Sequence, residues 1–217
     1  MLVTHRKAGG STTQLFRVTA PMAEPEPLTD FAEPVSVATW EPRSGEYLVF
    51  ERSSGGDEAT HLYRLDIAAR KVTQLTETPE LHEIQGWLHQ SSQLLVGSLP
   101  LDRTAQGGSR ERLHQTITLI DPATPGRRRT VAELPGTGWS VAGVSWDDRR
   151  AALTRYISAT ESQLWLLDLR SGKTRQLLPA PGSKRKSSFL ATGFKRDGSG
   201  IWLVSVAYLV KSDAIRP

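Results

Sequence analysis

Apolar and polar residues alternate along most of this 217-residue chain in short runs that turn residues separate, a pattern typical of antiparallel β-strands. Four runs share one design: an alternating apolar core, a polar last residue and then a turn. These runs are Gln14–Thr19, His61–Asp66, Thr116–Asp121 and Gln163–Asp168. Their last residues stand at positions 19, 66, 121 and 168, which gives spacings of 47, 55 and 47 residues. Because no stretch has a sustained helical period, the chain is predicted to be all-β.

Each of these runs belongs to a larger repeat. A further strand follows after a short turn, as in Lys71–Thr76 and Thr174–Leu178. Between copies lie pairs of strands joined by a tight polar turn, at Val37–Phe50, Ile84–Val96, Gly143–Leu153 and Gly193–Leu203. Four antiparallel strands that recur every ~40 to 50 residues are typical of a β-propeller blade. A β-sandwich is the all-β alternative, but it does not predict the same four-strand unit returning in the same order.

The fold class predicted is therefore a partial β-propeller of about four to five four-stranded antiparallel blades in one domain, 1–217. The blade repeats are expected at residues 1–30, 35–77, 83–134, 140–180 and 189–213. Neighbouring blades bury their faces against each other. We accordingly expect the apolar residues beside the turns to pack between blades, namely Trp40, Trp87, Val144 with Trp146, and Phe194.

The two ends of the chain depart from this repeat. Met1–His5 is interpreted as the second strand of a blade that lacks its first, and the last unit stops after its second strand. We expect a propeller truncated at both ends. Unpaired strand edges invite pairing with another chain, so self-association is an expected interaction.

Composition narrows the class of protein. Charged residues make up 23% of the chain and hydrophobic residues 38%, which favours a globular domain over a disordered one. The absence of cysteine excludes disulfides, thiolate zinc sites and a cysteine nucleophile. No run is long and apolar enough for a membrane helix, and no signal peptide is visible, so a soluble protein is expected and a cytoplasmic location is favoured. A net charge of +4 specifies no partner.

Several segments resemble the propeller of prolyl oligopeptidase-family serine peptidases. They are Trp40-Glu-Pro42, Phe50–Glu58, His61–Asp66, Lys71–Thr76, Gly138–Arg149 and Arg155–Asp168. The dipeptidyl peptidase and acylaminoacyl peptidase branch is the most similar one, and the resemblance extends to about Ser205. The turn-and-strand units are also similar to those of TolB-like and WD40-like propellers.

The resemblance implies a propeller that stands over an α/β-hydrolase domain, limits access to it and lends side chains to substrate recognition. In that family the nucleophile, the acid and the histidine all lie on the hydrolase domain, which this sequence does not contain. The chain by itself is therefore expected to be no enzyme, with a peptide substrate or a hydrolase domain as its partner. Two alternatives stay open: a stand-alone TolB-like propeller that acts as a protein-interaction scaffold, and a glycan- or lyase-type propeller.

The residues expected to contact a peptide lie on loops. Arg52, Asp57 and Glu58 flank the Gly55-Gly56 turn, and a carboxylate pair there can hold a cationic group such as a peptide amino terminus. Arg155 and Glu161 occupy the equivalent loop of a later blade. The alternative for each of them is a solvated turn or a salt bridge between blades.

Other motifs are weaker. Gly138–Gly143 is similar to a Gly-x-Ser-x-Gly nucleophile elbow but has Ala142 at the second glycine, so no catalytic residue is predicted. His82, Glu83 and His89 lack the spacing of a helical metal site, and the two histidines are interpreted as loop and turn residues, with no metal and no cofactor expected. The basic clusters Arg127–Arg129 and Lys184–Lys186 lie in turns without interleaved aromatics, so nucleic-acid binding is not expected.

Overall fold

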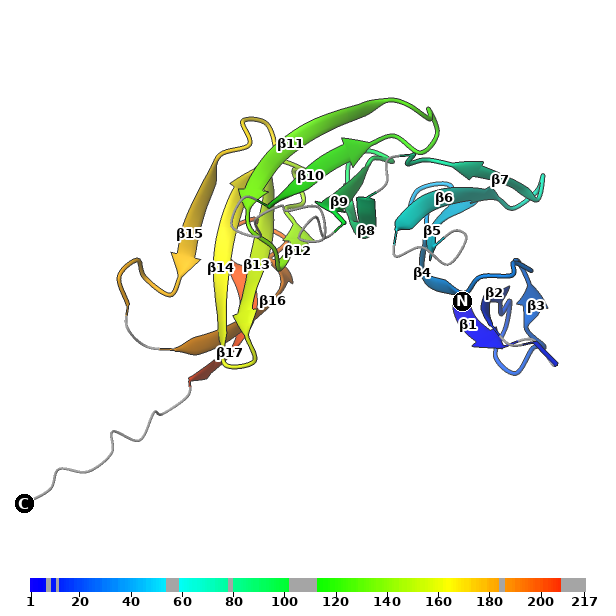
Figure 1. Ribbon diagram of the computed structural model, residues 1–217, viewed down its shortest axis with the longest axis horizontal. Coiled ribbons are helices and arrows are strands. Elements are labelled where there is room, and N and C mark those ends of the chain that lie inside the picture. The colour runs from blue at the N-terminus through cyan, green and yellow to red at the C-terminus, as the bar shows by residue number, and fades with distance from the viewer. Residues whose placement is uncertain are drawn as a thin grey trace, which may run out of the picture. The chain divides into compact units, whose positions relative to one another are not determined.

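The computed structural model describes residues 1–6, 9–10, 12–53, 59–77, 80–101, 113–183 and 186–207. These residues form five antiparallel sheets and no helix (Figure 1). Strands that follow each other in the sequence are neighbours in every sheet, so each sheet is a meander. The predicted fold class, an all-β partial propeller of four-stranded antiparallel blades, is confirmed.

The sheets contain three, four, four, four and two strands in chain order. The first sheet is β1 (Leu2–Arg6), β2 (Thr13–Arg17) and β3 (Glu26–Pro27), and the second is β4 (Val35–Trp40), β5 (Tyr47–Ser53), β6 (Thr60–Asp66) and β7 (Lys71–Gln74). The third sheet is β8 (Glu80–Trp87), β9 (Leu94–Pro100), β10 (His114–Ile120) and β11 (Arg128–Pro135). The fourth is β12 (Trp139–Val144), β13 (Arg150–Ser158), β14 (Glu161–Asp168) and β15 (Thr174–Leu178), and the fifth is β16 (Ser187–Phe194) with β17 (Ile201–Ala207).

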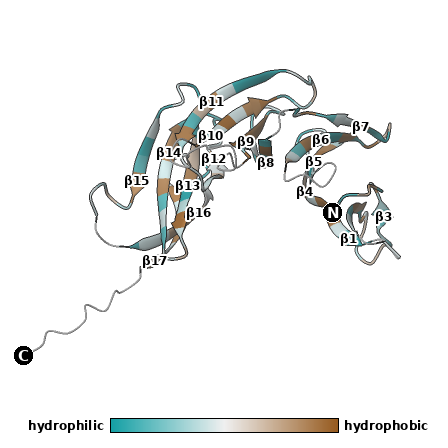
Figure 2. Ribbon diagram, in the orientation of Figure 1, coloured by the Kyte–Doolittle hydropathy of each residue, from teal (hydrophilic) through white to brown (hydrophobic). Residues whose placement is uncertain are grey.

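The chain divides into two compact units, Met1–Gly136 with the first three sheets and Thr137–Pro217 with the last two. In both units the central strands carry most apolar residues, whereas the outer strands β7, β11 and β15 are largely hydrophilic (Figure 2). Among the residues that the structure describes, no helix is long and apolar enough to cross a membrane.

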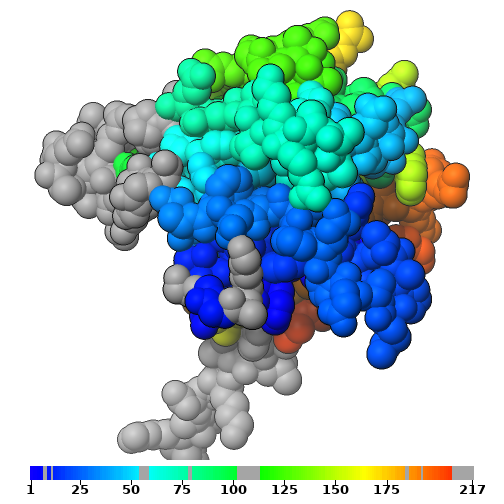
Figure 3. All heavy atoms as spheres, turned by 90° about the vertical axis from the view of Figure 1, so that its right-hand side faces the viewer, coloured from blue at the N-terminus to red at the C-terminus, as the bar shows by residue number. Residues whose placement is uncertain are grey.

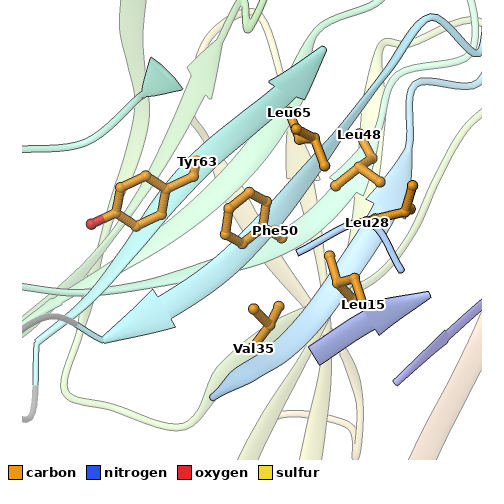
Figure 4. Close-up of a cluster of buried hydrophobic side chains, with 7 residues drawn as sticks. All are labelled: Leu15, Leu28, Val35, Leu48, Phe50, Tyr63 and Leu65. Carbon is orange, nitrogen blue, oxygen red and sulfur yellow. The ribbon is translucent and has the colours of Figure 1, made fainter. Parts of the chain in front are cut away.

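The core of the first unit forms where sheets lie face to face. Leu15 and Leu28 of the first sheet region pack against Leu48, Phe50 and neighbouring residues of the second sheet (Figure 4). Figure 3 shows brighter blue atoms between the dark blue atoms of the first residues and the cyan atoms of the second sheet. Because successive side chains on a strand point to opposite faces, Val49 packs on the third sheet instead. The central strands of the second sheet are thus buried on both faces.

The aromatic residues beside the turns follow the expectation with one exception. Trp40 packs on the first core cluster and Trp87 on the second, where its Nε1 donates a hydrogen bond to Thr39 Oγ1 at 3.0 Å. Phe194 packs between the last two sheets. Trp146 is 41% exposed, so the prediction that it packs between blades is wrong. It stands in the turn after β12, where the Arg196 guanidinium lies 5.2 Å from its ring centre.

A threonine closes the outer edge of two successive sheets in the same way. Thr29 Oγ1 accepts a hydrogen bond from the Leu15 backbone N–H at 2.9 Å, and Thr76 Oγ1 accepts one from the Leu62 N–H at 3.0 Å. All four residues are buried. A buried N–H group needs such a partner because water cannot reach it. This bond explains why the repeat has a threonine at this position.

Replacing Thr76 by valine keeps the shape of the side chain but removes the acceptor. We expect Thr76→Val to lower the free energy of unfolding by about 1–3 kcal/mol, because the buried Leu62 N–H then has no partner. Urea denaturation followed by circular dichroism measures this change. Thr124→Val, at an exposed turn position, is the matched control and should have little effect. Equal stability of the two variants would contradict the assigned role of Thr76.

The turn between β4 and β5 is organised by one buried carboxylate. Glu41 accepts hydrogen bonds from the backbone N–H groups of Arg43, Ser44 and Gly45, and from the hydroxyls of Ser44 and Ser92. Ser92 belongs to the corresponding turn of the third sheet, so the carboxylate also ties two sheets together. Burial acts to raise the pKa of Glu41, but these hydrogen bonds outweigh it and lower the pKa to about 2.

A lowered carboxyl pKa stabilises the folded state above the unfolded pKa of 4.5, and this contribution is lost as the pH falls towards about 2. We expect Glu41→Gln to reduce stability at neutral pH and to flatten the loss of stability between pH 4.5 and 2. Urea midpoints across this pH range test the expectation. Glu46→Gln, an exposed change in the same turn, should keep the wild-type pH dependence. If Glu41→Gln keeps it too, the carboxylate does not stabilise the turn.

Candidate functional site

Arg52, one of the predicted peptide contacts, lies near the end of β5 with its guanidinium against two aromatic rings. Its Cζ is 4.2 Å from the ring centre of Phe31 and 4.6 Å from that of Tyr63. Both rings stack on Phe50, at 5.6 and 5.4 Å between ring centres. The Gln14 side-chain amide fixes Phe31 by bonding both its backbone N–H and its carbonyl. The aromatic core therefore determines where this cation lies.

Arg155 occupies the equivalent strand position in the second unit. The backbone carbonyl of Tyr47 accepts the hydrogen bond that closes the hairpin turn before Arg52, and the carbonyl of Arg150 does the same before Arg155. Each arginine lies five residues after this closing residue. The guanidinium Cζ of Arg155 is 5.1 Å from the ring centre of Trp139, which is buried and packs edge-on against Trp165. The repeat thus places an arginine on an aromatic ring in both units.

The Nε atoms of both arginines are buried and have no hydrogen-bond partner among the described residues. A guanidinium held through its face keeps its N–H groups in the plane of the fork, the geometry that suits a carboxylate or a carbonyl oxygen. This arrangement can therefore recognise an anionic or carbonyl group. Arg52 and Arg155 belong to different units.

The predicted acidic residues give a different result. Asp57 and Glu58 lie outside the described residues. Glu161 begins β14, and the Lys186 Nζ lies 4.0 Å from its carboxylate. Lys186 directly precedes β16, so this ion pair links consecutive sheets, in agreement with the salt-bridge alternative for Glu161.

Glu51, next to Arg52, is a buried carboxylate that sequence reasoning missed. The Ile84 N–H of the third sheet donates a hydrogen bond of 2.6 Å to its carboxylate. Burial raises the pKa of Glu51, and this single bond opposes the rise only in part. The available signal in the sequence was a charged residue that directly follows the apolar run Tyr47–Phe50.

Histidines of neighbouring sheets also meet. The prediction that His82 lies in a loop or turn is wrong: it is buried in β8, where its Nδ1 is 2.8 Å from the Ser98 hydroxyl. The ring centres of His61 and His82 lie 5.9 Å apart, and the buried His61 Nδ1 has no partner among the described residues. In the part of the chain that the structure describes, no three side chains of the metal-binding types form a metal site.

Two further motifs can be placed. Trp139 and Ser140 begin strand β12, and a Cβ on the preceding Gly138, at φ +84°, would come within 2.5 Å of the Tyr156 carbonyl oxygen. The segment is therefore a glycine turn leading into a strand. Arg128 and Arg129 lie in strand β11, so the prediction that the whole basic cluster is a turn is wrong. Of these three arginines only Arg127 lies in the turn, 3.9 Å from Asp121. Lys184 and Arg185 lie outside the described residues.

Comparison with known proteins shows the fold alone. No family model matches the chain, and no curated protein matches it. Among solved structures, a prolyl endopeptidase is similar at a TM-score of 0.65 and 12% identity, over 89% of this chain and 29% of its own. TolB from Acinetobacter baumannii is similar at a TM-score of 0.58 and 16% identity, over 95% of this chain and 49% of its own. An oligogalacturonate lyase in complex with manganese is similar at a TM-score of 0.65 and 14% identity, over 92% of this chain and 55% of its own.

The fold is that of a β-propeller of the kind found in prolyl endopeptidases and TolB. The chain spans between 29% and 55% of the length of these three proteins. At identities of 12–16%, the likeness extends to the path of the backbone and not to any activity.

The buried Glu51 leads to a prediction opposite in sign to that for Glu41. A raised carboxyl pKa means that stability falls as the pH rises above the unfolded value of 4.5. We expect Glu51→Gln, which keeps an oxygen for the Ile84 N–H, to raise the urea midpoint at pH 7 and to leave it almost unchanged at pH 4. Glu24→Gln, at an exposed position, should alter neither. A lower midpoint for Glu51→Gln at pH 7 would show that the charge itself stabilises the fold.

Proposed function

We propose that this chain is the propeller portion of a prolyl oligopeptidase-family serine peptidase, where it gates access and contributes to peptide recognition. The observation that carries the proposal is the repeated arginine–aromatic arrangement at Arg52 and Arg155. On this proposal the chain contributes recognition rather than bond cleavage. The resemblance of its segments to the dipeptidyl and acylaminoacyl peptidase branch and its backbone likeness to a prolyl endopeptidase support it.

The physical argument rests on preorganisation. Phe31 and Tyr63 hold the Arg52 guanidinium at 4.2 and 4.6 Å, so little side-chain freedom is lost when an acceptor binds. A peptide offers carbonyl oxygens along its backbone and a carboxylate at its end, and a guanidinium can donate two parallel hydrogen bonds to the latter. Hydrogen bonds from a charged donor contribute about 1.5–3 kcal/mol each.

A stand-alone, TolB-like scaffold is the second candidate, and the fifth sheet favours it. Leu190, Trp202 and Val204 on one face of β16 and β17 are 63%, 61% and 57% exposed. Among the described residues β17 pairs with β16 alone, so its other edge is open. A second copy fits this edge, because two β17 strands related by a two-fold axis would complete a four-stranded antiparallel sheet like those of the chain itself. In that pairing Val204 faces its own copy.

Peptide binding separates the two candidates. We expect the chain to bind a proline-containing peptide with a fluorophore at its amino end and a free carboxylate, as fluorescence anisotropy measures. Arg52→Gln and Arg155→Gln should each raise the Kd about tenfold or more, in line with the loss of one charge-assisted hydrogen bond. Arg149→Gln, whose side chain is 82% exposed, is the matched control and should leave the Kd unchanged.

Equal Kd values for all variants would exclude these arginines as recognition residues. The absence of any peptide binding, together with a dimeric mass in light scattering that Val204→Lys reduces to a monomer, would favour the scaffold. Binding of an oligogalacturonate in place of a peptide would support the glycan-type alternative.

A further inference from the structure

A pocket of about 750 Å³ lies in the first unit, between the outer edge of the second sheet and one face of the third. Gln74–Glu77 form its wall on the second sheet. Its other wall comes from strands β8 to β11 and from the turn after β10. The volume is in the range of small-ligand sites in proteins. Arg52 and Arg155 do not line it, so it is distinct from the site of the proposed function.

The charged residues of this pocket are segregated by sign except for Asp121, which lies at the basic end. The carboxylates of Glu77, Glu80 and Glu133 line the pocket, and the strand register places Glu80 and Glu133 toward one end. Arg127 and Arg128 line the other end. Asp121 lies 3.9 Å from Arg127 and offsets its charge, so Arg128 is the cation that can pair with a ligand. A pocket with an acidic end and a basic end is complementary to a ligand with opposite charges at its two termini.

Strand register determines how far apart the two ends are. Glu133 pairs with Thr116, and Arg128 pairs with Ile120. Thr116 and Ile120 are four residues apart on β10, which at 3.3 Å per residue separates the ends by about 13 Å. Glu80 belongs to the acidic end as well. His82, two residues further along β8, pairs with Ser98, and Ser98 pairs with Thr116, the partner of Glu133.

The wall between the charged ends carries hydroxyl groups. Thr116 and Thr118 on β10 and Thr130 on β11 all line the pocket, because alternate residues share one face of a strand. A hydroxyl donates and accepts hydrogen bonds, so such a wall can serve both the N–H and the carbonyl groups of an extended backbone. Val96 and Ile120 add apolar surface beside them.

We propose that this pocket binds a short extended peptide with free termini, of about four residues. The amino terminus lies at the acidic end near Glu133, and the carboxylate lies at the basic end, where Arg128 donates hydrogen bonds to it. Four extended residues span about 13 Å, which matches the distance between the charged ends. The proposal goes beyond the proposed function and does not depend on Arg52 or Arg155.

Blocked peptides test the assignment on the unmodified chain. Isothermal titration calorimetry with tetra-alanine is expected to show binding, and N-acetylation or C-amidation should each weaken it about tenfold or more. Tetra-alanine that binds no more tightly than its doubly blocked form overturns the proposal. Spermidine that binds while tetra-alanine does not would identify a polyamine site and overturn it as well.

Variants then assign each end. Arg128→Gln should weaken tetra-alanine binding about tenfold and abolish the effect of C-amidation, and Glu133→Gln should abolish the effect of N-acetylation. Arg129→Gln and Glu83→Gln are the matched controls, since these residues neighbour the lining ones on the same strands and do not line the pocket. Controls that weaken binding as much as the lining variants refute the assignment.

Two further measurements keep the two proposals separate. Arg128→Lys, which retains the charge and loses the fork, should recover part of the binding even if Arg128→Gln is poorly folded. Arg52→Gln should leave the effect of N-acetylation unchanged. Loss of that effect in Arg52→Gln would transfer recognition of the amino terminus to the arginine–aromatic site and refute the pocket.

Discussion

Burial of both faces of the second sheet is the constraint on which the first unit depends. Leu48 and Phe50 on one face pack with residues of the first sheet region, while Tyr47 and Val49 on the other pack with residues of the third sheet. A strand cannot bury both sets of side chains without a sheet on each side. The stability of each sheet therefore depends on its neighbours, and polar groups at the contacts need partners from the next sheet.

Glu41 and Glu51 show how differently such partners can affect one residue type. Both carboxylates are buried and both accept a bond from the third sheet. Glu41 accepts hydrogen bonds from three residues of its own turn and from Ser92, and its pKa falls to about 2. Glu51 accepts a single bond within the strand region, so desolvation dominates and raises its pKa. The sign of the shift therefore depends on how far the hydrogen-bond donors offset the desolvation of each carboxylate.

The fifth sheet does not meet this constraint, because only one of its two faces is buried. Trp202 and Val49 occupy equivalent strand positions. Trp202 lies two residues after Gly200 and Val49 two residues after Tyr47, and the carbonyls of Gly200 and Tyr47 each close a hairpin turn. Val49 is fully buried against the third sheet, whereas Trp202 is 61% exposed. The opposite face of the fifth sheet is covered, because Ala191 and Ile201 pack with residues of the fourth. Apolar surface of this kind on a blade is normally covered by another sheet.

The sequence by itself determined the strands, their order and the repeat, because alternation and turn residues act over a few neighbouring positions. The runs ending at Asp66, Asp121 and Asp168 each form the third strand of a sheet. Only the tertiary structure decided what lies across from each strand. His61 and His82 meet from different sheets, and Arg52 reaches Phe31 across a 21-residue separation. A β-bulge between Ile117 and Thr118 shifts the register that places Glu133 and Arg128 at opposite ends of the pocket. The period of two in the sequence determines which residues of a strand share a face, but it does not determine which sheet that face meets or where a bulge shifts the register.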